Sequence, residues 1–520
     1  MTRTTIVRLV LLGLILFLFV YPLVRLLLLP VLMPVLASSH QSGGWHAVAD
    51  SLALALVTAT IAAPLGALLA AFVTTRSGPV ALITAIMLWV LFLAPSYVLT
   101  TGWMVVFDTP SWRASLLGQA FFGPAGLILL YIVKALPFSA FVARATIGGA
   151  GAALGEAALV HALPRTRRIG IALRLLAPAL VTGFAVAVIE TMQEFGIPAT
   201  LGTATHLPIL TYAIYQRLAE TPTDFAGAAI LCWRLIAIAG VLAVASLAVQ
   251  RRNAALRTGR ARAPVRRPPH RAEAIGVGLI TAGLGAIGAA IPIVALMTRA
   301  LSGGWLATPD LGAVLRSLGF GLVGATLAMT VAIVLLKLRD GGARRVTAAI
   351  DAALIANLAV PGLVLGAGYI VAFNNRWLPL YGTTGLLIIA YAAGMIPIAL
   401  RMVQGAFGDL DRNLGAAARL HGLSRATRAI DIEAALLAEP LTYGFLMVCG
   451  AIMFELPISE LLYPPGETPL GVAIVTLDQM SDFAAAARLA LLGLAAMAIL
   501  AVLLLGAIRF IAVPRKMAAA

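Results

Sequence analysis

Four glutamates stand at the ends of apolar runs, and their carboxylates are the side chains of this sequence best suited to meet a charged solute. Carboxylates within a membrane are costly and usually face a cavity or a partner, and hard cations prefer oxygen ligands. These groups could guide a cation through a gate or cap helix ends, and capping is the commoner role. The candidate gate or pathway residues are Glu190, Glu194, Glu455, Glu460, Pro198 and Pro457.

No other pattern indicates catalysis or a bound cofactor. His40, His46 and His206 do not have the spacing of a metal site. Cys232 and Cys449 fall inside separate apolar runs and support neither a disulfide framework nor a thiolate metal site. The sequence contains no G-x-x-x-x-G-K-[ST] loop, so ATP hydrolysis by that route is not expected of it. We expect no enzymatic activity and no cofactor in this chain, and a metal site stays unassigned.

The composition predicts the elements that must position these residues. The chain is 61% hydrophobic and 11% charged, far from the roughly 25% charged residues of a soluble domain. A membrane-spanning helix needs about 20 mainly apolar residues, and backbone groups in lipid are satisfied within helices. We predict an all-α polytopic membrane protein with about twelve spans of that length. These lie near residues 5–29, 48–74, 80–106, 120–145, 171–197, 224–249, 274–298, 312–337, 348–373, 384–404, 436–459 and 484–511.

The distribution of positive charge predicts the orientation. The formal net charge is +16, but the basic residues gather in alternate loops, which are cytoplasmic by the positive-inside rule. Both termini are then cytoplasmic, and nucleic acid is not an expected partner. The first run is too long for a signal peptide, so we interpret it as a retained span. The basic loops are marked by Arg76, Arg165, Arg167, Arg168, the stretch 251–271, Arg339, Arg344, Arg345, Arg412, Arg419, Arg425, Arg428, Arg515 and Lys516.

The chain also repeats itself in order. "DSLALALVTATIA" is matched by "RSLGFGLVGATLA", which pairs Ser51 with Ser317, and "APSYVLTTGW" is matched by "VPGLVLGAGY" at the same offset of 266 residues. Later matches pair His161 with His421 at an offset of 260, and Pro198 with Pro457 at 259. Such a small drift over colinear matches indicates two copies of one unit.

The repeat predicts the domain organisation. Residues 1–250 form the first six-span copy, 251–272 a basic linker rich in Arg and Pro, and 273–520 the second copy. Both copies enter the membrane in the same sense, which predicts a parallel repeat with a pathway between the halves. Prolines at 95, 137, 361 and 397 lie within predicted spans, where neighbouring helices or a wet cavity must satisfy the freed carbonyls. We interpret these prolines as packing kinks rather than as transport groups.

One basic amphipathic segment occurs in both copies. "GEAALVHALPRTRRIGIALRLLAPAL" covers residues 155–180 and contains a break at Pro164; "GAAARLHGLSRATRAIDIEAALLAEPL" follows the same span in the second copy. A short helix held between two spans is suited to a groove on a cytosolic partner. A solvated loop, or one that lies on anionic lipid, explains the charges equally well.

This segment resembles the EAA motif of permease subunits in binding-protein-dependent ABC importers. Glu156, Ala157 and Ala158 match the head of the motif, Ala162 stands in place of its glycine, and Pro178 matches the proline of "LLRPAL". In the second copy the glycine is present and the acidic residue is lost; the corresponding residues are Ala416, Ala417, Ala418 and Gly422. "ETMQEFGIPATL" and "FELPISELLYPPGETPL" resemble segments of fused ferric-iron-type permeases, so the resemblance extends over essentially the whole chain.

The resemblance implies an inner-membrane importer permease whose halves form one translocation pathway. Loops 154–178 and 414–440 would be coupling helices seated on two copies of a cytosolic ABC ATPase, which binds ATP and Mg²⁺. An extracytoplasmic binding protein would deliver the substrate. Glu156 would pair with a basic residue of one ATPase subunit, and Ala416 would leave the second contact without that ion pair. An exposed ion pair is worth only about 0–1 kcal/mol, so the second contact need not fail.

The substrate remains open at this stage. Likeness ranks ferric iron first, while thiamine, phosphonate and other small solutes have permeases of similar appearance. A different class, the ion-coupled secondary transporters, would also show doubled helices but would not need paired cytoplasmic loops of this kind.

Overall fold

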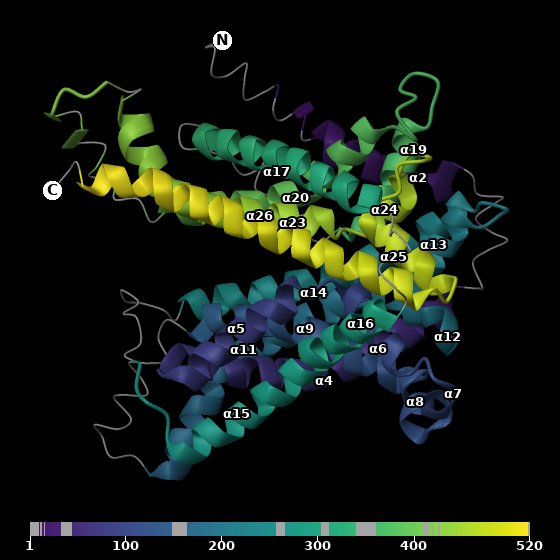
Figure 1. The fold of residues 1–520 in the computed structure, drawn as a ribbon, viewed down its shortest axis with the longest axis horizontal. Helices are drawn as coiled ribbons and strands as arrows, with labels where there is room; N and C mark the ends of the chain where they lie inside the picture. Colours follow the sequence, from purple (N-terminus) through teal and green to yellow (C-terminus); the bar gives the residue numbers. More distant parts are fainter. Residues whose placement is uncertain are drawn as a thin grey trace. The chain divides into compact units, whose positions relative to one another are not determined.

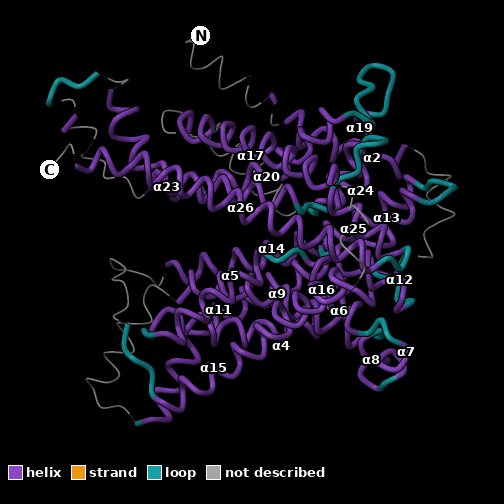
Figure 2. Tube along the Cα trace, viewed as in Figure 1, coloured by secondary structure: helices purple, strands orange, loops and turns teal. Residues whose placement is uncertain are grey.

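The computed structural model describes most of the chain as helix. The described residues are 10, 13–14, 16–32, 44–147, 164–255, 266–302, 311–339, 360–408, 414, 417–418, 420–424 and 427–517. Within these ranges the regular elements are helices, apart from two isolated bridges at Arg76–Arg267 and Asn374–Pro379. Figure 2 shows the helices joined by short loops. The all-α prediction is confirmed.

Nine described helices are long and apolar enough to cross a membrane, and a bent pair raises this to ten. The predicted number of twelve is not established, because the described parts of the first and ninth predicted spans are the shorter helices 17–32 and Gly362–Phe373. The spanning segments are Trp45–Thr75, Pro124–Arg144, Leu176–Gln193, Phe225–Val249, Arg271–Ser302, Leu311–Lys337, Thr384–Gly408, Ile432–Met453 and Phe483–Ile508.

The third predicted span is broken rather than straight. Helix α5 (Pro79–Leu93) and helix α6 (Ser96–Val106) meet at an angle of 95°. The cause is Pro95, because a proline pushes the residue before it out of the helical region, and Ala94 is extended, with ψ 126°. The ammonium group of Lys134 donates to the carbonyl of Ala94 at 2.9 Å and lies 3.4 Å from that of Phe92. Lys134 therefore supplies donors that the broken helix lacks. Pro361 likewise precedes helix α19 (Gly362–Phe373).

The described helices fall into two compact units that do not follow the two predicted copies. One unit contains residues 1–28, 306–474 and 488–520, and the other contains residues 29–305 and 475–487. Each unit thus holds the first span of the other predicted copy. The predicted copies remain a prediction about sequence duplication, with the boundaries 1–250, 251–272 and 273–520. In the packing units, the first helix of each copy lies with the helices of the other copy.

Each unit has the same three-helix core. In the unit of residues 29–305, α4 (Trp45–Thr75) packs on α9 (Pro124–Ile147) and on α11 (Arg165–Gln193) (Figure 1). In the other unit, α17 (Leu311–Arg339), α20 (Thr384–Gly408) and α23 (Ala435–Met453) pack on one another in the same order. The further long helices are α14 (Phe225–Ala255) and α26 (Phe483–Met517). The duplication itself stays a prediction.

A matched pair of serines holds equivalent short helices against these cores. Ser51 Oγ accepts the N–H of Leu210 at 2.8 Å, and Ser317 Oγ accepts the N–H of Leu470 at 2.7 Å. The two acceptors are 266 residues apart in the numbering and the two donors 260, the offsets of the sequence matches. The donors begin helices α13 (Leu210–Ala219) and α25 (Leu470–Gln479), each of ten residues. Positions in these two helices can therefore be compared directly.

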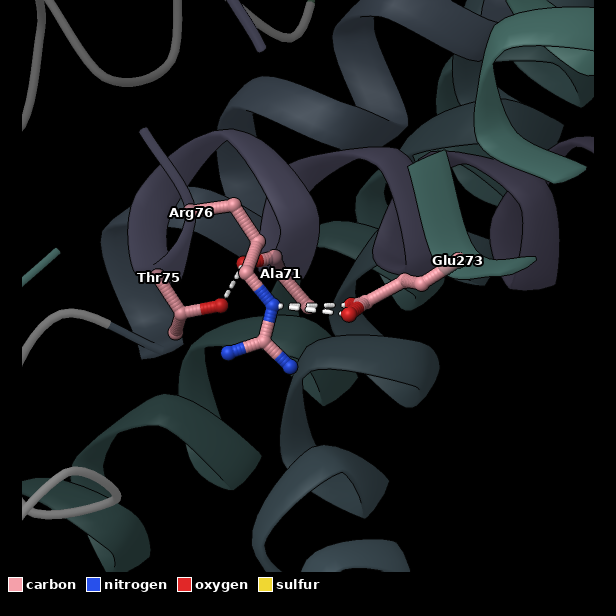
Figure 3. Close-up of polar contacts among 4 residues, drawn as sticks. All are labelled: Ala71, Thr75, Arg76 and Glu273. Atoms are coloured by element: carbon pink, nitrogen blue, oxygen red, sulfur yellow. Dashed lines mark hydrogen bonds and ion pairs between the residues drawn. The ribbon is translucent and has the colours of Figure 1, made fainter. Parts of the chain in front are cut away.

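The exchanged first span of the second copy is fixed along its length. It consists of α15 (Arg271–Gly285), the π-helix η3 (Ala286–Ala290) and α16 (Ile291–Ser302). At its beginning, Arg76 Nε lies 2.9 Å from the carboxylate of Glu273, and Figure 3 shows this pair beside the bond from Thr75 Oγ1 to the carbonyl of Ala71. Further polar contacts join Thr84 to Thr281 (Oγ1–Oγ1, 2.9 Å) and Asp108 to Arg299 (Oδ2–Nη2, 2.9 Å).

A proline in each first span creates a bulge that the other copy satisfies. Pro292 follows η3, and Pro22 in α2 (Tyr21–Leu32) follows the π-helix η1 (Leu16–Val20). A proline has no N–H and so leaves a carbonyl one turn back without its donor. Trp103 Nε1–H donates to the carbonyl of Ile287 at 3.0 Å, and the Tyr369 hydroxyl donates to that of Leu18 at 3.0 Å.

A glycine beside each of these aromatic residues allows the close approach. A Cβ on Gly102 would lie 2.6 Å from Cβ and 2.9 Å from the carbonyl oxygen of Pro292, and one on Gly368 would lie 3.0 Å from the carbonyl oxygen of Pro22. Gly102 and Gly368, like Trp103 and Tyr369, are matched positions of the repeat. We call each glycine, aromatic residue and foreign proline bulge a clasp. The two clasps hold the exchanged spans in equivalent ways.

We predict that Gly102→Ala destabilises the protein by about 1–3 kcal/mol, because the added methyl group overpacks the contact with Pro292. Gly240→Ala, on helix α14 with nothing within 4 Å of the added Cβ, is the matched control. This change should be neutral or stabilising by up to about 1 kcal/mol. A thiol-reactive dye in a thermal ramp reports unfolding, because Cys232 and Cys449 are both buried. Equal midpoints for the two variants would show that the clasp tolerates a side chain.

Candidate functional site

The first predicted coupling loop lies largely outside the described residues. Glu156, Ala157, Ala158 and Ala162 fall in this part, so their predicted contact with a partner has no structural description. The described chain resumes at Pro164, which takes an extended conformation (ψ 149°) before helix α11 begins at Arg165. A proline just before a helix ends the preceding segment and starts the next. Helix α11 therefore starts directly after Pro164, and the helical piece predicted before this proline lies outside the described residues.

The second predicted loop is described at Leu414 and from Ala417 onward, apart from Arg419, Arg425 and Ala426, whereas Ala416 is not described. Gly422 has φ +71°, a left-handed conformation that glycine adopts without strain. The N–H of His421 donates to the carbonyl of Ala417 at 3.1 Å, and that of Leu423 donates to the carbonyl of Ala418 at 3.0 Å. These bonds close a helical turn at the glycine, as at a helix C-terminus. Gly422, the glycine that matches the motif, therefore terminates a helical turn.

A new helix starts directly after this turn. The Ser424 hydroxyl accepts the N–H of Thr427 at 3.1 Å, and its carbonyl accepts that of Arg428 at 3.0 Å, which is the pattern of an N-cap. The π-helix η4 (Arg428–Ala434) follows and continues into α23. Arg428 Nε pairs with Glu433 at 2.9 Å along this helix. The loop is therefore a helical turn, a glycine and a capped helix that runs to the membrane span.

The surface of this loop is apolar at its turn. Leu420 is 88% exposed and Leu423 is 40% exposed, while Ala418 is buried at 4%. Two exposed leucines beside the turn form a small apolar surface that water does not favour. Such a surface is suited to a groove on a partner protein.

The carboxylate of Glu194 stabilises the break after α11. Its Oε1 accepts the N–H of Gly196 at 2.8 Å and the hydroxyl of Ser96 at 2.6 Å, with the N–H of Ile197 at 3.4 Å. Ser96 is the first residue of α6, so this one oxygen links the break after α11 to the break before α6. A carboxylate at the free N–H groups of a helix start is electrostatically favourable. Pro198 opens the buried π-helix η2 (Pro198–Gly202) that follows.

In the second copy, Glu455 also caps a helix start, but it uses both of its carboxylate oxygens. Its Oε1 accepts the N–H of Ile458 at 2.7 Å, and its Oε2 accepts the N–H of Ser459 at 2.9 Å. These donors open helix α24 (Pro457–Leu462), whose first residue is Pro457. The hydroxyl of Tyr391 lies 2.7 Å from Ser459 Oγ and extends the network to α20. Glu194 and Glu455 therefore both cap helix starts, although aligning Pro198 with Pro457 places Gly196, not Glu194, opposite Glu455.

Glu190 and Glu460 take other positions. Glu190 lies one turn before Glu194 on α11, where Lys134 interacts electrostatically with both carboxylates. Glu460 lies within α24 and is half-buried. The described part of the chain contains no group of three or more His, Cys, Asp or Glu that could hold a metal ion. The predicted pathway role of these residues therefore stays a prediction.

Sequence reasoning missed two residues of the break in the first copy. Lys134 is a single basic residue within an apolar run, so hydropathy did not single it out. Its role also depends on the carbonyls that the break at Pro95 leaves without donors. Asp478 on α25 is buried at 3% and contacts the hydroxyl of Thr101 through Oδ2. A lone acidic residue in an apolar helix was the available signal, but nothing in the sequence indicated that the two segments would meet.

A family match covers part of the second predicted copy, and two curated proteins are similar to segments of the chain. Residues 341–515 match the family described as binding-protein-dependent transport system inner membrane component. The chain is 28% identical over 182 residues to the probable ABC transporter permease protein y4fN of Sinorhizobium fredii, covering 34% of this chain and 31% of that protein. It is 43% identical over 56 residues to the putative ferric transport system permease protein FbpB 1 of Haemophilus influenzae, covering 11% of this chain and 9% of that protein.

The matched segments are short relative to these proteins. The chain spans less than a third of the length of the curated relatives it matches. No solved structure matches the chain.

We predict that Glu455→Ala lowers stability by about 0.5–2 kcal/mol, because it removes the carboxylate that accepts the first N–H groups of α24. Glu439→Ala changes an exposed carboxylate on α23 and should shift stability by less than about 0.5 kcal/mol. Thiol-dye unfolding of both detergent-solubilised variants checks the difference. A Glu455→Ala protein as stable as the Glu439→Ala protein would contradict the capping role.

Proposed function

We propose that this chain, whose residues 341–515 belong to the family of binding-protein-dependent transport system inner membrane components, is the membrane-spanning permease of an ABC importer. The observation that carries the proposal is the turn in the second predicted loop. There an apolar turn at Gly422 stands outside the membrane span and is joined to it by one helix. A secondary transporter does not need such a surface. The two copies would together line one pathway in the inner membrane, with both termini cytoplasmic.

The proposed partners are two copies of a cytosolic ABC ATPase. The exposed Leu420 and Leu423 supply apolar contacts that a groove on an ATPase subunit would cover. ATP and Mg²⁺ would be bound by those subunits and not by this chain. An extracytoplasmic binding protein would deliver the substrate at the opposite side of the membrane.

Two continuous helices connect the proposed docking loops to the acid-capped breaks. Helix α11 runs from Arg165 to Gln193 and ends at Glu194. In the second copy, η4 and α23 run from Arg428 to Met453 and end two residues before Glu455. A helix transmits displacement along its axis because its backbone is hydrogen-bonded throughout. Closure of the ATPase pair would thus move the ends of these helices and exchange the inward-open and outward-open pathways.

The two docking contacts are proposed to differ. Glu156 would form an ion pair with a basic residue of one ATPase subunit, supported by Ala157, Ala158 and Ala162. In the second copy Ala416 cannot form that pair, so apolar contact and the turn at Gly422 would carry the interface. The second contact then depends on shape rather than on charge.

The proposed substrate is ferric iron. The support is the similarity of a short segment to the putative ferric transport system permease protein FbpB 1, together with the carboxylates at both breaks. Thiamine, phosphonate or another small solute is the alternative within the same importer class. The ligand that remains bound to the co-encoded binding protein discriminates between these substrates.

We predict that Glu156→Arg weakens assembly with the cognate ATPase and lowers binding-protein-stimulated ATP hydrolysis, because it places like charges together at the interface. Ala416→Glu is the converse variant and should tighten the second contact by up to about 1 kcal/mol, the worth of an exposed ion pair. Co-purification with the ATPase and stimulated hydrolysis are the measurements. If Glu156→Arg left both unchanged, the ion pair would be wrong; if no ATPase bound the wild-type chain, a secondary transporter would be favoured.

We predict that Leu420→Asp disrupts the second docking contact, because a charge would be desolvated in an apolar groove. Trp377→Asp changes a side chain that is 93% exposed in the loop between α19 and α20, outside the spanning segments, and is the control for a general effect of charge. Cross-linking of the ATPase to the permease in native membranes should fall for Leu420→Asp while the permease level stays constant. A fall of the same size in both variants would argue against docking at the turn.

A further inference from the structure

Helix α6 carries a buried hydroxyl face directly after the break at Pro95. Ser96 is 9% exposed, and Thr100 and Thr101 are fully buried at 0%. The threonine hydroxyls make the usual bonds to the carbonyls one turn back, Ser96 at 2.8 Å and Tyr97 at 2.9 Å. Each hydroxyl oxygen keeps lone pairs after it has donated its hydrogen. These oxygens can therefore still act as acceptors on a helix that is otherwise apolar. These three residues, with Tyr97, define what we call the hydroxyl face.

The second copy builds the same helix without these groups. Gly362, Leu363, Gly366 and Ala367 stand in α19 at the positions of Ser96, Tyr97, Thr100 and Thr101. Leu363, Gly366 and Ala367 are buried in α19, as are their counterparts in α6, whereas Gly362 is half-buried. The fold therefore does not need hydroxyl groups at these positions, because it forms α19 without them. Ser96 joins Glu194 at the break, whereas the buried hydroxyls of Thr100 and Thr101 have no counterpart in α19.

A buried carboxylate completes one end of this face. Asp478 Oδ2 contacts the Thr101 hydroxyl, while Asp478 Oδ1 has no hydrogen-bond partner among the described residues. The equivalent position of α13 is Leu218, which is buried at 8%. A carboxylate that keeps a free oxygen inside protein is costly, and the other copy avoids this cost with leucine. Intramembrane carboxylates of this kind mark a path for ions or solutes.

A second carboxylate stands at the other end of the face. Ser96 Oγ lies 2.6 Å from Glu194 Oε1. Ser96 and Thr101 are five residues apart on one helix, which corresponds to about 7.5 Å along its axis. The face therefore has two pairs, each made of one hydroxyl and one carboxylate. Both pairs lie within the unit of residues 29–305 and 475–487.

We propose that the hydroxyl face of α6, with Glu194 and Asp478 at its ends, is a transit site for a hard metal cation that passes through the permease. Carboxylate and hydroxyl oxygens are the ligands that hard cations prefer. Each pair offers few ligands, and the described residues contain no three-ligand metal cluster. Weak successive sites suit passage, because a cation that is bound too tightly does not leave. This inference rests on the proposed import function. Among the substrates considered for that function, it favours a hard metal cation over an organic solute.

The test uses terbium, a hard trivalent cation whose luminescence is sensitised by nearby aromatic rings such as Tyr97. Tb³⁺ alone is titrated into the purified full-length chain in lipid nanodiscs. The wild type should give a saturable signal, and Asp478→Asn should weaken binding by about tenfold or more, since ligand charge sets cation affinity. Asp482→Asn is the control, because Asp482 is exposed and an asparagine keeps its bond to the N–H of Ala485.

A double variant separates a structural role from a binding role. Thr101→Ala with Asp478→Leu installs the residues that the other copy uses at these positions, Ala367 and Leu218. Its thiol-dye unfolding midpoint should equal or exceed that of the wild type, while its Tb³⁺ signal is lost. A lower midpoint would assign Thr101 and Asp478 to the fold and overturn the proposal. So would a wild type without a saturable signal, or an Asp478→Asn protein that binds Tb³⁺ like Asp482→Asn.

Uptake by the complete reconstituted importer distinguishes this inference from the proposed function. Asp478→Asn should lower ferric uptake while binding-protein-stimulated ATP hydrolysis continues. If the wild type imports ferric iron and Asp478→Asn imports it equally well, the transit site is wrong and the function stands. If the wild type imports another solute and no iron, the proposed substrate fails, and the transit site fails with it.

Discussion

A proline within a membrane helix leaves a carbonyl oxygen without its donor, and the described fold is arranged around the groups that replace this donor. Lipid offers no hydrogen bond, so another part of the chain must supply one. Lys134 does so at the break before α6, while Trp103 and Tyr369 do so at the bulges of the two first spans. Because these donors belong to other elements, each proline links two segments. The same proline therefore causes a local break in its helix and requires a tertiary contact to satisfy the freed carbonyl.

The exchange of first spans follows from this arrangement. Each bulge accepts a hydrogen bond from a helix of the opposite copy, and each matched glycine lets that helix approach the proline closely. Neither copy satisfies its own bulge in this way. Each packing unit is therefore assembled from both halves of the sequence.

The described helices also connect the predicted docking loops to the breaks. Helices α11 and α23 end near Glu194 and Glu455, whose carboxylates hold the next helix starts. Both acids act as caps, yet they occupy different positions of the repeat and use different partners. The first copy adds Lys134, Ser96 and Thr101, where the second has Gly394, Gly362 and Ala367. Each break thus has its own polar network, and the second is built from Glu455, Ser459 and Tyr391 instead.

The sequence by itself determined the fold class and the segments that carry the family likeness, and it predicts the repeat. Hydropathy, charge alternation and colinear matches are properties of contiguous residues, so they can be read without coordinates. The number of spans was harder to predict, because Pro95 changes direction within a run that remains apolar. Glu194 and Glu455 were recognised as candidates, but their hydrogen-bond donors were not.

Tertiary structure alone decided which distant groups meet. The contacts of Trp103 with Ile287, Tyr369 with Leu18, and Thr101 with Asp478 join residues separated by 184, 351 and 377 positions. No periodicity encodes such pairings, because they depend on which helices pack together and at what height. The same reason explains the exchange of first spans, since a contiguous repeat in sequence does not state which copy its first helix will join.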